Sequence, residues 1–373
     1  MEYRPPHTRP FNEMTWGVCV PESCGPRTVE KFLDAMLSRS HLGAVGMRAK
    51  ITINERCQDY NRPHKLDGPF FGFIGIIGFL VFICLLFTYL NYRREKYTPD
   101  TITSRIVKAF CLKENGQDLM SAHKDGIGVF YGIRFLTMCL IVIHHEMGIT
   151  NAGPISDGVL LDKNAQSPLG LLVLHNDLFV DTFFLLSGFL AMVKLAKFEI
   201  LPNPVLLIFQ RYIRSVVALA VVVFFVGAMF PHIGSGPLWV RASRDATLCR
   251  ENGWLNILMV NNYINTENIC IIASWYIPCD FHFFVVTVLV YYLYKKHPRL
   301  GLAIAAILSA ASIVVPGVLN YIYQSSPVQA FTYEFLIDPR QNKDFHATYI
   351  KSHMRYSTYL IGFFSGYFFV NYG

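Results

Sequence analysis

The feature that most limits this fold is a set of apolar runs long enough to cross a lipid bilayer. The first, residues 69–90, contains no charged side chain, and about 20 such residues span a bilayer core as a helix. Similar runs follow at residues 129–147, 178–194, 213–230, 275–294, 300–321 and 356–372. The sequence therefore predicts an all-α, polytopic membrane bundle with about seven spans.

The charged residues support this interpretation and predict the topology. Only 16% of the residues are charged, against about 25% in typical soluble domains. The net charge of +7 could suggest a nucleic-acid partner, but the basic residues cluster beside the apolar runs, so we expect none. Because Arg93, Arg94 and Lys96 follow the first run, the positive-inside rule places them in the cytosol. The N-terminal region is then extracellular or lumenal, in a plasma or endoplasmic reticulum membrane.

Four segments follow from this map. Residues 1–68 form a small extracytoplasmic region with cysteines, 69–92 the first transmembrane helix, 93–127 a cytosolic linker and 128–373 the membrane domain. Residues 1–12 lack the apolar core of a signal peptide, and no polar tail follows the last run. We therefore expect the chain to be incomplete at both ends.

The cysteines predict disulfides rather than a metal site. Cys19, Cys24, Cys57, Cys249 and Cys270 fall on the expected oxidising side, and a Cys249–Cys270 bridge is the first pairing we predict. There is no CxxC pair, and HHEMGI lacks the second histidine of a zinc-protease helix because Ile149 stands there. We therefore expect no metal cofactor.

The run at 129–147 carries ionisable residues that are costly in hydrocarbon. Arg134 and His145 are eleven residues apart, so at 100° per residue they share one helix face, with a rise of about 16 Å. Arginine can bind the phosphates of acyl-CoA, and histidine can act as a base toward a hydroxyl. The alternatives are a topology anchor for Arg134 and a packing role for one histidine. His144 points about 100° away and is the second candidate.

Two further acidic residues lie in the expected spans. Asp181 needs a partner at that depth, and we expect it to orient His145 as a catalytic residue or to pair with an arginine; the alternative is an outer position reached by water. Trp275 and Tyr276 are site candidates or an aromatic belt, and Asp280 beside them is a site candidate. Ser187-Gly188 and the Gly362/Gly366 pair, in contrast, indicate close helix packing.

Arg211 and Arg214 lie at the expected cytosolic end of the run at 213–230. We expect them either to join Arg134 around the CoA phosphates or to anchor the topology.

Several motifs occur in the order of a known family. GIRFLTMCLIVIHH resembles its first membrane helix, with Arg134 and His145 at the expected spacing. The others are VDTFFLLSGFL (180–190), QRYIR (210–214), SGPLW (235–239), NNY (261–263), SWYIPCDFHF (274–283) and, ahead of them, TWGVCVPESC (15–24). Together they resemble the acyltransferase-three superfamily and its animal nose-resistant-to-fluoxetine branch.

The resemblance implies an O-acyltransferase that moves an acyl group from acyl-CoA to a hydroxyl of a lipid or another acceptor. It also implies more spans than this chain supplies. The sequence departs from the family pattern at Ser215, where a proline is usual, and at His282, where glutamine is usual. A rival from another class is a non-catalytic membrane protein that binds or transports lipids or small molecules, with Arg134 and His145 along the path.

Overall fold

The fold is seen in a computed structural model. It describes residues 17–21, 23–53, 66–93, 101–121, 127–152, 155, 157–174, 177–235, 239, 243–326, 328–329 and 331–372. Every regular element in these ranges is helical. The long helices are α3 (Gly68–Arg93), α6 (Gly128–Ala152), α9 (Asp177–Ala196), α10 (Pro204–Ala228), α13 (Tyr276–Lys296), α14 (Pro298–Tyr323) and α16 (Ser352–Tyr372). The all-α expectation is confirmed.

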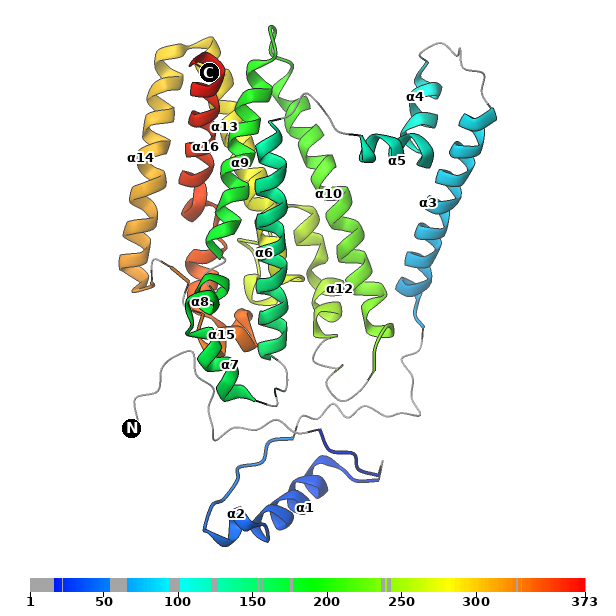
Figure 1. Cartoon of the computed structure of the whole chain (residues 1–373), viewed down its shortest axis with the longest axis vertical. Coiled ribbons are helices and arrows are strands. Elements are labelled where there is room, and N and C mark those ends of the chain that lie inside the picture. The colour runs from blue at the N-terminus through cyan, green and yellow to red at the C-terminus, as the bar shows by residue number, and fades with distance from the viewer. Residues whose placement is uncertain are drawn as a thin grey trace.

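Within the described ranges, six helices are long and apolar enough to cross a membrane: α3, α6, α9, α10, α13 and α14. They run alternately up and down, so the basic linkers lie at one end, the top of Figure 1, and the N-terminal segment lies near the other end. The chain is therefore an integral, multi-pass membrane protein. The seventh expected span, 356–372, coincides with α16, which is less apolar than the other six and lies inside the bundle beside α9.

The predicted start of the fourth span was wrong. We expected it at residue 213, after QRYIRS, but the helix already begins at Pro204, with Asn203 as its N-cap. Asn and Pro at these two positions are favourable helix starts. Arg211, expected just before the span, consequently lies well inside α10, as Arg214 does. A charge can occupy this depth when it is paired, and α13 supplies the partner of Arg211.

The centre of the bundle is the contact between α9 and α16. A Cβ atom on Gly188 would overlap the Tyr359 backbone, and one on Gly362 would overlap the Leu185 backbone. Small residues therefore allow the two helices to approach closely, as expected of membrane helices. Phe184 and Tyr359, both fully buried, pack there against residues of α13.

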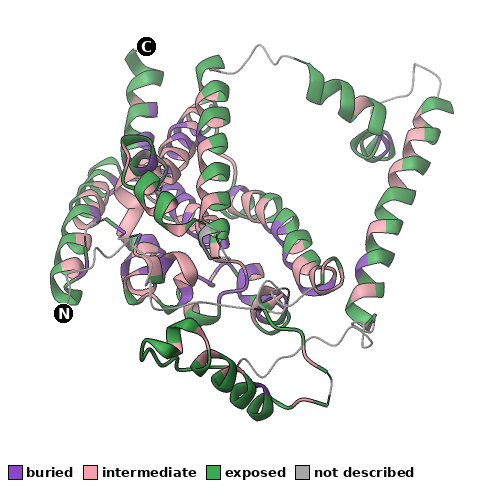
Figure 2. Cartoon of the chain, turned by 60° about the horizontal axis from the view of Figure 1, so that its bottom comes forward, coloured by how far each residue is buried: buried purple, intermediate pink, exposed green. Residues whose placement is uncertain are grey.

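Helix α3 lies at the edge of the molecule and is mostly exposed (Figure 2). Its lower half touches α10 through Phe73 and Phe224, whose ring centroids are 5.4 Å apart. Just before α3, Asp67 binds Arg250 of α12 (Arg244–Ile257) at 2.6 Å. The linker helices α4 (Ile102–Ala109) and α5 (Leu112–Met120) lie at the upper end of α3 (Figure 1).

Short helices cover the lower end of the bundle. They are α7 (Gly158–Ala165), α8 (Pro168–Leu174), α12 and α15 (Tyr333–Ile337), while α1 (Pro26–Ser38) and α2 (His41–Ala44) belong to the N-terminal segment. The predicted Cys249–Cys270 disulfide is confirmed and ties α12 to the loop before α13. Cys19 and Cys24 are free thiols, and Cys57 lies outside the described residues.

Candidate functional site

An ion pair lies inside the bundle between α10 and α13. Arg211 donates from one terminal nitrogen to Asp280 at 2.5 Å and to Ser187 Oγ of α9 at 2.6 Å. Its guanidinium also lies over the Phe284 ring, 4.5 Å from the centroid. The pair joins three helices, and the Asp280 carboxylate offsets the cost of a cation within a span.

Polar groups from two more helices surround this pair. Tyr359 of α16 lies close enough to Arg211 and Asp280 for electrostatic interaction, but its buried hydroxyl has no hydrogen-bond partner among the described residues. Tyr276 of α13 is in electrostatic range of the same pair and of Arg134 of α6. We call this group the polar centre: Arg134, Ser187, Arg211, Tyr276, Asp280 and Tyr359.

The polar centre retains unused hydrogen-bonding capacity. Three of its buried atoms have no partner among the described residues: Arg211 Nε, Asp280 Oδ1 and the Tyr359 hydroxyl. A buried donor or acceptor without a partner is costly and rare in folded proteins. The three atoms therefore indicate a place where a ligand or water can bind.

The second ion pair involves Asp181. Its Oδ1 accepts from Arg355 of α16 at 3.0 Å, and the Arg355 guanidinium lies 4.2 Å from the Tyr349 ring centroid and 5.2 Å from that of Trp275. Of the two partners expected for Asp181, the structure therefore shows an arginine. Trp275 is buried in the core and does not belong to an exposed aromatic belt.

Arg355 was not among the site residues predicted from the sequence. A signal for it existed, because a carboxylate within a span requires a nearby cation and Arg355 directly precedes the last apolar run. Its position in an expected outer loop, 174 residues after Asp181, concealed the relation.

The ionisable residues of helix α6 differ in how far the rest of the protein covers them. Arg134 is half-buried on the side of the polar centre. His144 is half-buried and packs edge-on against Phe331, with ring centroids 5.2 Å apart. His145 is exposed, and its Nδ1 lies 2.9 Å from the carbonyl oxygen of Ile141, one turn earlier. The face shared by Arg134 and His145 is thus covered at Arg134 and open at His145.

The remaining candidates lie apart from the polar centre. Arg214 is exposed on α10, and His282 of α13 contacts Ser352 Oγ through its Nδ1 at 2.9 Å. Among the described residues, no three His, Cys, Asp or Glu side chains gather as a metal site. Residues 236–238 of the SGPLW motif lie outside the described part of the chain.

Comparison with known proteins adds a family match. Residues 130–373 match a family described as an acyltransferase domain. The chain is also 24% identical to nose resistant to fluoxetine protein 6 of Caenorhabditis elegans, over 94% of this chain. It spans about half of that relative, namely 46% of its length. No solved structure matches the chain.

Proposed function

Because this chain belongs to the acyltransferase-three family, with a match over residues 130–373, we propose that it transfers an acyl group from acyl-CoA to a hydroxyl of a lipid or another acceptor. The polar centre is the observation that carries this proposal. Arg211 is paired with Asp280 within the spans, Arg134 of α6 is in electrostatic range of Tyr276 beside this pair, and three buried polar atoms there lack partners in the described part of the chain.

Arg134 is the proposed contact for the CoA phosphates. It is the seventh residue of α6, about 9 Å from the end of the helix that carries the basic linkers. A guanidinium can bind a phosphate with two parallel hydrogen bonds and stays charged throughout. Arg211 is engaged with Asp280, so we propose that it supports the donor site through its free Nε and that Arg214 contributes from the surface of α10.

His145 is the proposed general base, about 16 Å farther along α6 than Arg134. It would take the proton of the acceptor hydroxyl while the hydroxyl oxygen attacks the thioester carbonyl. The carbon–sulfur bond then breaks, and CoA leaves as a thiolate that takes up a proton. The exposure of His145 suits an acceptor that arrives from the lipid or from the expected extracellular or lumenal side. Asp181 was expected either to orient His145 or to pair with an arginine. It pairs with Arg355, so we propose that it positions the inner helices.

A second function remains a candidate. The two ion pairs within the bundle, Arg211–Asp280 and Asp181–Arg355, would also suit a protein that binds or carries a small molecule or lipid without chemistry, because charged side chains in spans often line a substrate path. In such a protein His145 would exchange protons with the cargo.

One assay separates the two functions. Membranes containing the chain are given a panel of acyl-CoAs, and release of the CoA thiol is measured. Loss of a general base lowers a rate by about 10²- to 10⁴-fold, so we expect release by the wild type and its loss in His145→Ala. His144→Ala is the matched control and should retain release. Equal background from the wild type and His145→Ala would contradict the proposed transferase.

A further inference from the structure

A pocket of about 650 Å³ lies at the lower end of the bundle, away from the polar centre. Its walls come from the start of α12, the loop at 263–268, the end of α14 and the segment at 340–353. The lining is strongly basic, with one carboxylate, Glu267, and six basic side chains: Arg244, Arg340, Lys343, His346, Lys351 and His353.

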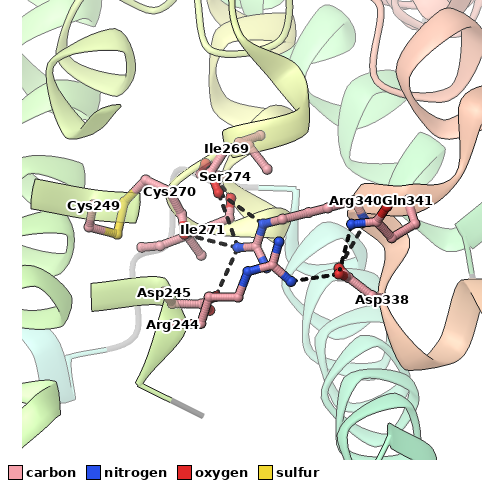
Figure 3. Close-up of polar contacts among 10 residues, drawn as sticks. All are labelled: Arg244, Asp245, Cys249, Ile269, Cys270, Ile271, Ser274, Asp338, Arg340 and Gln341. Carbon is pink, nitrogen blue, oxygen red and sulfur yellow. Dashed lines mark hydrogen bonds and ion pairs between the residues drawn. A yellow bond between two sulfur atoms is a disulfide. The ribbon is translucent and has the colours of Figure 1, made fainter. Parts of the chain in front are cut away.

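Two of these side chains build the wall. Arg340 is buried and donates to Asp245 at 2.9 Å and to the carbonyl oxygens of Ile269 and Cys270. Arg244 pairs with Asp338 at 2.7 Å. Figure 3 shows the two guanidiniums side by side, next to the Cys249–Cys270 disulfide. Because each arginine has its own aspartate, these charges fix the wall and contribute little net charge to the pocket.

The excess charge comes from the two lysines. Lys351 donates to the carbonyl oxygen of Asn262 at 3.0 Å, and its ammonium lies 5.1 Å from the Tyr263 ring centroid. A lysine ammonium has three N–H groups, so two remain after this bond. Burial lowers the pKa of Lys351, as expected for a cation held partly away from water. Lys343 is exposed, so the described lining of the pocket contains two ammonium groups and one carboxylate, that of Glu267.

Neutral donors complete the lining. The Tyr263 hydroxyl lies 3.1 Å from Nδ1 of His353, and the side chains of Tyr323, Gln341 and Asn268 also face the pocket. Such a set suits a compact anion with several oxygens, which can accept from cations and neutral donors together. The volume is ample for a phosphate with a small organic group attached.

We propose that this pocket binds the phosphate group of a phosphomonoester. The site is separate from the polar centre, and the proposal does not depend on acyl transfer. The phosphate can come from a soluble metabolite or from a lipid headgroup, since both present the same oxygens.

The test uses the purified full chain. Binding of glycerol 3-phosphate is measured by calorimetry in detergent, and binding of phosphatidic acid is measured in nanodiscs. Lys343→Glu removes one ammonium from an exposed position, so folding should be unaffected and an unchanged thermal transition checks this. A hydrogen bond to a charged group corresponds to roughly a tenfold change in affinity, so we expect at least that loss. Lys163→Glu is the control, because Lys163 is exposed in α7 at the same end.

Each outcome decides the proposal. Binding of glycerol 3-phosphate that weakens in Lys343→Glu but not in Lys163→Glu supports a soluble ligand. The same pattern with phosphatidic acid alone supports a lipid headgroup. Binding of neither probe, equal weakening by both variants, or equal binding of uncharged glycerol would overturn the proposal. Acyl-CoA turnover is not part of the readout, so a failure here leaves the proposed transferase standing.

Discussion

Helices α6 and α9 are both apolar and both long enough to span a membrane, but the protein surrounds them very differently. In α9, 39% of the apolar stretch is buried inside the bundle, and in α6 only 6% is. Helix α9 lies against α16 at glycine positions, whereas α6 touches its neighbours at a few points, such as Thr137 and His144. The helix that carries the proposed base is therefore the loosely held one.

Because of this difference, we expect the region around α9 to stabilise the fold and α6 to carry the residues of the proposed reaction. Around α9, charged side chains are paired and their partners come from neighbouring helices, so substitutions there should act on folding. On α6, Arg134 and His145 make few contacts that hold the fold, so substitutions there should act on chemistry. Four sets of variants test the expected effects on stability.

The largest expected effect is at the Arg211–Asp280 ion pair, which lies within the spans and is mostly covered by protein. Arg211→Ala leaves Asp280 without its cation, and breaking a buried pair costs about 3–5 kcal/mol in free energy of unfolding, which we take as the upper range here. A denaturing-detergent titration measures this. The exposed Arg214→Ala should be close to neutral. Replacing both partners, Arg211→Met with Asp280→Leu, should recover most of the loss, and a double variant as unstable as the single one would contradict the assignment.

The next pair compares one substitution on the two helices. Leu186 of α9 is buried, at 2% exposure, and Leu136 of α6 is 63% exposed. Leu→Ala in a packed core costs about 2–5 kcal/mol because a cavity is left. We expect this range for Leu186→Ala and less than about 0.5 kcal/mol for Leu136→Ala, measured in the same titration. Similar losses at both positions would show that α6 is packed as tightly as α9.

The close contact between α9 and α16 gives a smaller effect. Gly362→Leu inserts a side chain where even a Cβ atom would overlap the Leu185 backbone. Overpacking of this kind costs about 1–3 kcal/mol. Gly317→Leu in α14 is the matched control, since a Cβ there meets nothing within 4 Å. The thermal transition should fall only for Gly362→Leu, and equal transitions would argue against this helix contact.

The smallest effect concerns the attachment of α3. Although desolvation raises the pKa of Asp67, the Phe70 N–H and Arg250 hold it below its usual value of 3.8. A lowered folded-state pKa contributes stability above the unfolded value, and this is lost as the pH falls. Because the pair is partly exposed, Asp67→Asn should cost at most about 1 kcal/mol at pH 7. The difference from wild type should shrink toward pH 3, and a difference that grows would contradict this sign.

Much of the fold could be predicted because hydropathy and basic flanks are local properties. The spans, the Cys249–Cys270 disulfide and the packing glycines followed from short stretches of sequence. The start of α10 could not be predicted in this way, because Arg211 can lie within the span only when it is paired with Asp280, 69 residues later. Similarly, Asp181 could be recognised as needing a partner, but Arg355 comes from the far end of the chain.

The exposure of His144 and His145 likewise could not be predicted from the sequence. Adjacent residues on a helix face different directions, but which direction is covered depends on α15 and its neighbour Phe331. The sequence therefore indicates His145 as the first candidate for the base and His144 as the second. Their different surroundings follow from the packing of other elements.

The most direct test of the account is steady-state kinetics on Arg134→Gln and His145→Ala with varied acyl-CoA. If Arg134 holds the donor, its loss should raise KM about tenfold with little change in kcat, as expected for a lost charged contact. If His145 is the base, its loss should lower kcat at least about 10²-fold with KM nearly unchanged. Opposite assignments, or kinetics identical to wild type in both variants, would contradict the account.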